Sequence, residues 1–369
     1  MLGNHKLVVD AVTGIGDIFQ DHADELFLVL GQNRIVPSAI YIIGVGQFDQ
    51  YLPRIMDLID NDTVKVIFGN VKEGSETFEY FINKYNIKEL VDRDKILLLS
   101  GGDIDKKYQA IVCDYFLSAV VNHYGNTKVK DYTAEMYSKK DKPYKFLFLN
   151  GRGRPHRHYL LDKFKQSNLL SSSLWTNFEP PFEVRSLPYE YEATEYKNNI
   201  VNISTGNITM PTSTTNNVTI KEALFNNTWG DGIVTPNTYI DTYFSVVTET
   251  VFNHPYSFRT EKTWKPILIG HPFIIASNQG YYRDLHNLGF QTFGHLIDES
   301  FDNIDNNQLR LDRIVAVVND LCQQDLPAFL AAAEETCKYN QQHAVDLSYK
   351  LRQEFPQKFT QFINERFRI

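Results

Sequence analysis

The amino-acid sequence predicts an α/β protein with two mostly parallel sheets followed by a helical tail. Apolar runs alternate with amphipathic stretches, a polar, lysine-rich stretch interrupts them, and the alternation then resumes. At 369 residues the chain is long enough for two domains, each with its own core. The tail from residue 310 onward carries apolar residues at helical spacing.

The first part of the chain alternates strands with helices. We expect strands at 6–12, 38–46, 64–70 and 95–101, helices at 18–30, 48–60 and 75–86, and a continuation of the pattern over 109–124. This alternation predicts a mostly parallel, doubly wound sheet. The stretch 126–144 has little apolar periodicity, so we place the domain crossing there, near Lys142.

The second part repeats the pattern around a long insertion. We expect strands at 144–150, 242–253, 271–277 and 291–296, and helices at 156–170, 260–270 and 281–290. The polar, aromatic segment 171–220 is too long for a simple connection, which indicates a functional excursion or flap. Its aromatic residues suit either sugar stacking or a local core: Trp175, Phe178, Tyr189 and Tyr191.

Composition and charge exclude several classes of protein. With 43% apolar and 22% charged residues the chain is typical of a globular protein, and a formal net charge of −8 disfavours a general nucleic-acid binder. The N-terminus lacks the pattern of a secretory signal, and no stretch is apolar enough to span a bilayer. Three scattered cysteines predict neither a disulfide framework nor a zinc site. We expect a cytoplasmic protein. The usage of Asn, Lys, Tyr and Ile is typical of AT-rich genomes, including viral ones, and for a viral protein the expected location is the host cytoplasm.

A cluster of basic residues follows the strand 144–150. Arg152, Arg154, His156 and Arg157 crowd the start of the next helix, where cations oppose the helix dipole unless an anion is bound. Arginine offers phosphate two parallel hydrogen bonds. The cluster therefore predicts a phosphate site, with a solvated basic turn or an interdomain salt bridge as the alternative.

A second charged group precedes the strand 271–277. Thr260 can cap a helix whose first turn holds Glu261 and Lys262, next to Arg259. A carboxylate there suits two ribose hydroxyls and an ammonium suits a phosphate. The alternative is a helix surface pair that contributes a few tenths of a kcal/mol.

These residues carry a resemblance to a known family. From Tyr243 to Asp302, the stretches "YFSVVTETVFN", "FRTEKTWKPILIGHPFIIAS", "LHNLGFQTF" and "IDESFD" resemble the donor-binding region of exostosin and α1,3-fucosyltransferase type glycosyltransferases. Upstream, "KFLFLNGRGRPHR" is similar to the strand, Asn-containing turn and Arg that open the donor domain in that family, which points to Asn150 and Arg152. The resemblance covers the second half of the chain and is most specific in "TEKTWKPILIGHPFI".

The resemblance implies a GT-B fold, with two Rossmann-like domains facing a central cleft. Residues 1–142 would bind the acceptor, 143–339 would bind the nucleotide sugar, and helices from 340–369 would cross back onto the first domain. Glu261 would contact the ribose, and Lys262 with Arg157 or Arg154 would neutralise the diphosphate. Arg259 departs from the Val or Leu expected there, which leaves the sugar donor open.

The acidic candidates differ in role. Glu249, at the end of a strand, either holds the donor sugar or caps a backbone turn. A general base from the first domain would take the proton of the acceptor hydroxyl. Asp17 lies where heptosyltransferase-like GT-B enzymes carry a catalytic Asp, or it caps the helix at Ile18; Asp49 and Asp103 are reserves.

Other chemistries have weaker support. The acidic pattern from Asp103 to Asp105 resembles a short metal-binding pattern of other glycosyltransferases, but a solvated loop is the better interpretation, and we expect no metal or other cofactor. The dinucleotide fingerprint, the P-loop and the hydrolase elbow are incomplete or missing.

Together these observations predict a metal-independent glycosyltransferase that moves a sugar from a GDP- or UDP-linked donor to a glycan. The alternatives are a non-catalytic glycan- or nucleotide-binding protein of the same fold and a transferase acting on modified DNA, which the acidic balance disfavours.

Overall fold

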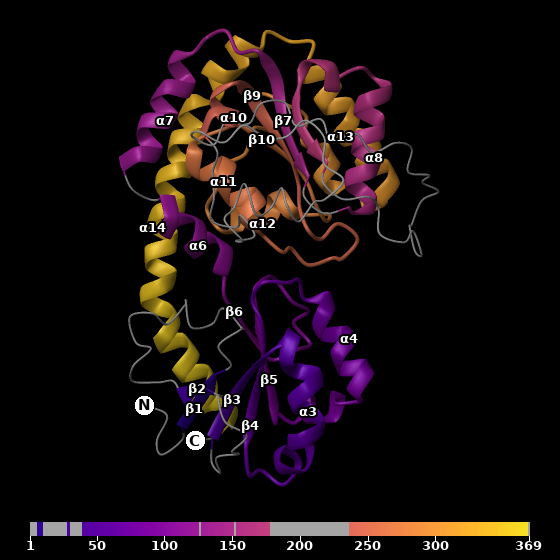
Figure 1. Ribbon diagram of the computed structural model, residues 1–369, viewed down its shortest axis with the longest axis vertical. Helices are drawn as coiled ribbons and strands as arrows, with labels where there is room; N and C mark the ends of the chain where they lie inside the picture. Colours follow the sequence, from indigo (N-terminus) through magenta and orange to yellow (C-terminus); the bar gives the residue numbers. More distant parts are fainter. Residues whose placement is uncertain are drawn as a thin grey trace. The chain divides into compact units, whose positions relative to one another are not determined.

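The computed structural model describes residues 6–9, 28–29, 39–124, 127–150, 153–177 and 236–367. These residues form an α/β protein with two parallel sheets, which confirms the predicted class (Figure 1). The chain divides into two compact units. The first comprises Met1–Ser118, Tyr256–Arg259 and Leu347–Ile369, and the second comprises Ala119–Pro255 and Thr260–Asp346.

The first unit contains a six-stranded parallel sheet in the order β2-β1-β3-β4-β5-β6. Its strands are β1 (Lys6–Val9), β2 (Leu28–Val29), β3 (Ala39–Gly44), β4 (Lys65–Asn70), β5 (Ile96–Ser100) and β6 (Ala110–Val112). The helices α3 (Val45–Asp60), α4 (Glu76–Tyr85) and α5 (Lys88–Asp92) connect the middle strands, and α6 (Tyr115–Tyr124) follows β6.

The central strands of this sheet are nearly continuous runs of apolar residues. All five residues of β5 are buried, as expected for a parallel strand covered on both faces. Phe68 of β4 packs edge-on against Phe78 and Phe81 of α4, with ring centroids 5.0 and 5.5 Å apart. The helical periodicity of α4 thus places its aromatic side chains on the sheet.

The second unit contains a four-stranded parallel sheet in the order β10-β9-β7-β8. Its strands are β7 (Tyr144–Asn150), β8 (Leu174–Asn177), β9 (Thr242–Thr248) and β10 (Phe273–Ala276). Helices α7 (Thr127–Ser138), α8 (Pro155–Gln166), α10 (Pro236–Ile240), α11 (Glu261–Ile269), α12 (Tyr281–Asn287), α13 (Asn307–Leu321) and α14 (Leu326–Phe367) surround it or extend from it, with short 3-10 turns at Leu170–Ser172 and Ser300–Asn303.

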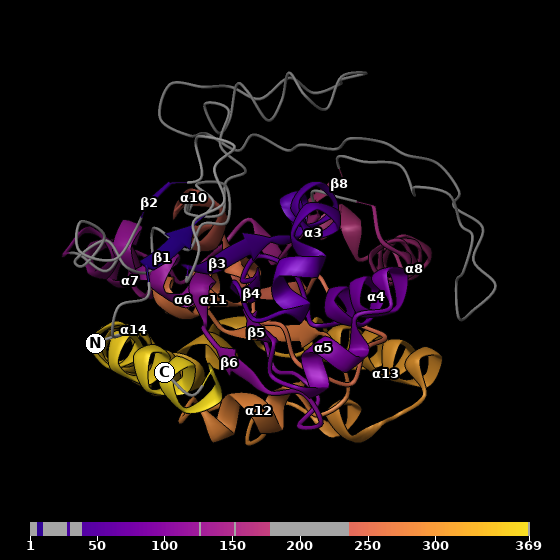
Figure 2. The same ribbon diagram turned by 90° about the horizontal axis from the view of Figure 1, so that it is seen from below.

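The strand order of this sheet reverses between β7 and β9. From β7 the chain passes through α8 to β8 on one side, and from β9 it passes through α11 to β10 on the other. Because such crossovers are right-handed, α8 and α11 cover opposite faces, as Figures 1 and 2 both show. In open α/β sheets ligands bind at the carboxyl ends of the strands at this reversal.

The lysine-rich stretch expected to form the domain crossing is largely helical and belongs to the second unit. Residues 127–138 form α7, and the compact units change at Ser118. Lys142 is 9% exposed, and its Nζ donates to the main-chain oxygens of Met136 and Ile240. Burial and the charge of Lys139, opposed by Asp241, lower the pKa of Lys142 to about 8.

The prediction of a strand at 291–296 was wrong. These residues form a turn in which Leu296 N–H and Ile297 N–H bond the main-chain oxygen of Phe293. Both main-chain groups of Gln291 are bound by the side-chain amide of Asn340, at 2.9 and 2.8 Å. A side chain of α14 thus takes the hydrogen bonds that a neighbouring strand would have taken.

Among the described residues, no helix is long and apolar enough to cross a membrane. The three cysteines, Cys113, Cys322 and Cys337, are buried and free.

Candidate functional site

Helix α11 begins at the cap that the sequence predicted. Thr260 has an extended backbone, and its hydroxyl accepts a hydrogen bond from Lys262 N at 3.3 Å. Thr260 N donates to Oε1 of Glu249 at 3.0 Å, and Glu249 directly follows the last residue of β9. Glu261 and Lys262 therefore occupy the first helical turn beside the carboxyl end of β9.

The other end of α11 is fixed as well. Gly270 has a φ of 72°, in the left-handed region, and His271 N–H bonds back into the helix at 2.8 Å, which closes a Schellman-type turn. Thr133 and Tyr137 of α7 and Gln341 of α14 donate to main-chain oxygens of this last turn. The position of the first turn is thus set by contacts at both helix ends.

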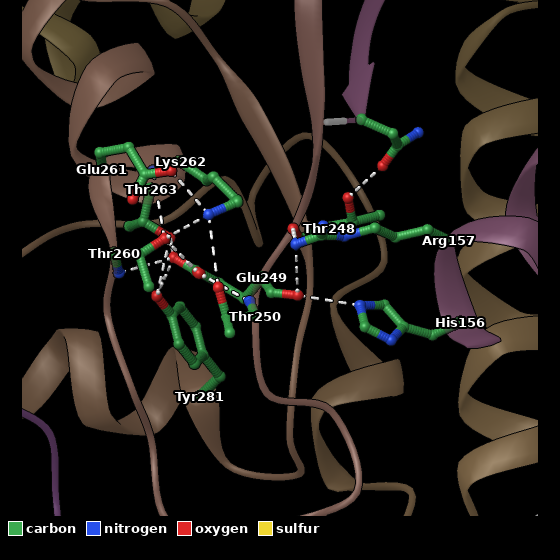
Figure 3. Close-up of polar contacts among 11 residues, drawn as sticks. His156, Arg157, Thr248, Glu249, Thr250, Thr260, Glu261, Lys262, Thr263 and Tyr281 are labelled. Carbon is green, nitrogen blue, oxygen red and sulfur yellow. Dashed lines mark hydrogen bonds and ion pairs between the residues drawn. The ribbon is translucent and has the colours of Figure 1, made fainter. Parts of the chain in front are cut away.

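The side chains of Glu261 and Lys262 bind each other (Figure 3). Lys262 Nζ lies 2.6 Å from Glu261 Oε1 and 3.3 Å from each of the hydroxyl oxygens of Thr250 and Thr260. The Glu261 and Lys262 side chains are 17% and 27% exposed. Burial raises the pKa of Glu261, but the charges of Lys262 and Lys265 and the hydrogen bond from Lys262 outweigh it and hold that pKa at about 2. Glu261 is therefore ionised at neutral pH.

Glu249 is a fully buried carboxylate at the end of β9. Its exposed fraction is 0%, and its Oε1 accepts from Thr260 N at 3.0 Å, Thr263 Oγ1 at 2.6 Å and Tyr281 OH at 3.3 Å. Its Oε2 accepts from Thr260 Oγ1 at 2.7 Å and Thr250 N at 3.0 Å. Both oxygens are turned into the protein, where they join the end of β9 to the starts of α11 and α12 (Figure 3).

The first turn of α8 binds the same strand end from the opposite side. His156 Nε2 donates to Glu249 O at 2.9 Å, and Arg157 Nη2 lies 3.1 and 3.2 Å from the main-chain oxygens of Thr248 and Glu249. Asn150, the last residue of β7, accepts from the Thr248 hydroxyl at 2.7 Å. Burial, assisted by the positive charge of Arg157, lowers the pKa of His156 well below its usual value, so the ring is neutral.

These contacts change the interpretation of the arginine cluster. Arg157 was expected at the diphosphate, but it is 2% exposed and directs Nη2 to main-chain oxygens of the strand end. Arg157 reaches this strand end from α8, whereas Lys262 reaches Thr250 from α11 (Figure 3). Arg154 is the N-cap residue of α8 and is partly buried. Among the described residues, Lys262 at the start of α11 is an expected cation whose side chain is partly exposed, at 27%.

Arg259 and Asp103, expected as a nucleotide ligand and as a reserve base, form an ion pair in the first unit. Arg259 is 2% exposed and places Nη1 2.8 Å from Asp103 Oδ2 and Nε 3.1 Å from Asp114 Oδ1. The Asp103 and Asp114 side chains are 39% and 8% exposed. The guanidinium of Arg259 therefore pairs with two carboxylates of the first unit.

The remaining expected residues have less structural description. Asp17 and Arg152 lie outside the described residues, as do Phe178, Tyr189 and Tyr191 of the insertion. Asp49 belongs to helix α3. Trp175 of β8 is 8% exposed and belongs to the buried core of the second unit. In the part of the chain that the structure describes, no three His, Cys, Asp or Glu side chains are grouped to hold a metal.

Four residues of the site were not expected from the sequence: Thr250, Thr263, His156 as a main-chain donor, and Tyr281. The spacing of Thr260 and Thr263 is a signal that could have been used, because residues three apart share a helix face. Tyr281 comes from another helix, and no local pattern indicates its partner.

Comparison of the chain with protein-family models, curated proteins and solved structures finds no match.

Proposed function

We propose that the chain is a glycosyltransferase of GT-B type that moves a sugar from a nucleotide diphosphate sugar to a glycan acceptor without a metal. The observation that carries the proposal is the pair Glu261 and Lys262, partly exposed in the first turn of α11. This turn lies at the carboxyl end of β9, beside the reversal of strand order at which α/β sheets bind ligands. The resemblance of "TEKTWKPILIGHPFI" to the donor-binding region of glycosyltransferases supports the same assignment.

The two side chains suit the two halves of a nucleoside diphosphate. The ionised carboxylate of Glu261 can accept from both hydroxyls of a ribose. The ammonium of Lys262 can bind a phosphate oxygen by exchanging one of its three present acceptors. Because Glu261 is one of those acceptors, nucleotide binding would redistribute hydrogen bonds within the pair.

The transfer proposed here breaks the bond between the anomeric carbon and the diphosphate. The diphosphate leaves with the electron pair, and its charge is met by Lys262. An acceptor hydroxyl oxygen forms the new bond to the anomeric carbon, and its proton passes to a carboxylate base. Both Asp103 oxygens are engaged by Arg259, at 2.8 and 3.2 Å, so Asp17 and Asp49 are the preferred candidates.

Nucleotide titration followed by product analysis tests the proposal. We expect GDP or UDP to raise the melting temperature of the protein. Lys262→Ala should lower the affinity for that nucleotide about tenfold or more, because a charge-assisted hydrogen bond is lost. Lys338→Ala is a matched control, because Lys338 forms a pair with Glu334 at 2.5 Å on the surface of α14.

The outcomes separate the possible functions. Sugar transfer to a glycan from one nucleotide sugar supports the proposal. Binding without transfer to any acceptor in a glycan panel would indicate a non-catalytic nucleotide-binding protein. Equal nucleotide affinity in the wild type, Lys262→Ala and Lys338→Ala would overturn the site.

A further inference from the structure

We infer that Glu249 is a positioning residue that fixes the Thr260 hydroxyl as an acceptor for Lys262. The inference rests on the proposed function for what the turn binds, although the contacts themselves do not depend on it. Glu249 is 0% exposed, so its carboxylate acts through the residues around it. It would therefore shape the nucleotide site without touching the nucleotide.

The surroundings of Glu249 require a carboxylate. Both oxygens face donors: Thr260 N and the Thr263 hydroxyl at Oε1, and Thr250 N and the Thr260 hydroxyl at Oε2. A glutamine would place its NH₂ group against a main-chain N–H in either orientation, Thr260 N in one and Thr250 N in the other. Such a clash of donors leaves buried polar groups without partners.

The orientation of the Thr260 hydroxyl hydrogen links Glu249 to Lys262. The Thr260 hydroxyl has a single hydrogen, and it points to Glu249 Oε2 at 2.7 Å. Its oxygen can then accept two hydrogen bonds, and two donors lie at 3.3 Å: Lys262 N and Lys262 Nζ. Glu249 therefore sets the polarity of a hydroxyl that caps α11 and holds the ammonium at the same time.

The rest of the network keeps this arrangement rigid. Tyr281 OH lies 2.7 Å from Thr263 Oγ1 and 3.3 Å from Glu249 Oε1. Thr250, whose N–H bonds Glu249, also presents its hydroxyl to Lys262 Nζ at 3.3 Å. Two of the three acceptors of Lys262 thus belong to residues that Glu249 holds.

The reactivity of the Lys262 amine reports this role directly. Acylation of each lysine by acetic anhydride, read by peptide mass spectrometry, would be compared in the wild type, Glu249→Gln, Thr260→Val and Thr260→Ser. Lys338 in the same protein is the internal reference. Glu299→Gln is the matched control, because Glu299, like Glu249, accepts hydrogen bonds from main-chain N–H and threonine hydroxyl donors in the same unit, here one of each.

We expect Glu249→Gln and Thr260→Val to raise Lys262 acylation about three- to tenfold relative to Lys338, the range for loss of one hydrogen bond. Thr260→Ser keeps the hydroxyl and should restore the wild-type value, and Glu299→Gln should not change it. A purely structural role would lower the melting temperature of Glu249→Gln and leave Lys262 acylation as in the wild type, which would overturn the inference. Should Glu249→Gln fail to fold, Thr260→Val and Thr260→Ser decide, since neither alters the buried charge.

Nucleotide binding distinguishes this inference from the proposed function. If the wild type binds no nucleotide but the acylation pattern holds, the positioning network stands and the proposed function fails. If the wild type binds GDP or UDP and Glu249→Gln binds it equally well, the inference fails and the proposed function stands. Weakening of about tenfold in both Glu249→Gln and Thr260→Val, with rescue in Thr260→Ser, supports both.

Discussion

The guanidinium of Arg259 spans the carboxylate of Asp103, with Nη1 2.8 Å from Oδ2 and Nη2 3.2 Å from Oδ1. Its Nε turns to Asp114, which follows β6 as Asp103 follows β5. Asp103 N also donates to Ser257 O at 2.8 Å. The segment Tyr256–Arg259 is thereby built into the first unit, directly before the residues of α11 in sequence.

Removal of Arg259 should destabilise the first unit strongly. Arg259→Gln leaves the Asp114 carboxylate, 8% exposed, without its cation, and breaking a buried pair in this way costs about 3–5 kcal/mol. Asp103 is 39% exposed, so Asp103→Asn should cost about 1 kcal/mol or less. Urea unfolding of both variants measures the difference, and similar losses in the two would show that burial does not control the effect.

Glu261→Gln should separate the binding of phosphate from the binding of nucleoside. The substitution removes the carboxylate that holds Lys262 Nζ at 2.6 Å, so the ammonium becomes more available to anions. We expect inorganic pyrophosphate to bind about threefold more tightly and GDP or UDP about tenfold more weakly, because the ribose loses the charge and one of the two acceptor oxygens of the carboxylate. Isothermal titration measures both.

The control for this prediction is Glu334→Gln, which breaks the surface pair with Lys338. It should change neither affinity. Equal weakening of pyrophosphate and nucleotide in Glu261→Gln would instead mean that the carboxylate serves only to hold the first turn of α11.

Glu299 should make stability depend on pH near neutrality. Burial, with the charges of Asp302 and Asp298, raises the pKa of Glu299 from 4.5 to about 7, against the opposing hydrogen bonds from Thr292 and Phe293. A raised pKa in the folded state stabilises the fold below pH 4.5, and this contribution is lost as the pH rises through about 7. The free energy of unfolding should therefore fall between these values.

Glu299→Gln has no proton to lose and should flatten this part of the profile. The difference between wild type and variant, measured by urea unfolding at several pH values, isolates the contribution of Glu299. A difference that does not change between pH 4.5 and 7 would contradict the shifted pKa.

Local signals predicted helix α11 well. Its limits are specified by Thr260 at the N-cap and Gly270 at the C-terminal end, with apolar residues between them. The helix in the structure runs over Glu261–Ile269. The roles of its neighbours depended on distant residues. Arg157 was assigned to a phosphate because a basic first turn opposes the helix dipole, whereas the strand end supplies two main-chain oxygens that no local pattern indicates.

Helix α7 and the false strand at 291–296 share one cause. The sequence of α7 has weak apolar periodicity, and part of its support comes from hydroxyl groups of Thr133 and Tyr137 that bind the end of α11. The segment at 291–296 was predicted to be a short strand, but the amide of Asn340 binds the main chain of Gln291. Contacts between residues far apart in sequence overrode the local pattern in both places.

Asn340→Ala should therefore loosen the turn that replaces the expected strand. Asn340 is 1% exposed, and its loss removes the hydrogen bonds to the N–H and the carbonyl of Gln291, which contribute about 0.5–1.5 kcal/mol each. Gln342→Ala on the same helix removes only an exposed bond to Asp346 and serves as the control. Hydrogen exchange at the Gln291 main-chain amide should be faster in Asn340→Ala than in the wild type and unchanged in Gln342→Ala. Urea unfolding of both variants measures the loss of stability. Unchanged protection there would mean that the packing of Phe293 against Phe273, with ring centroids 5.0 Å apart, suffices to hold the turn.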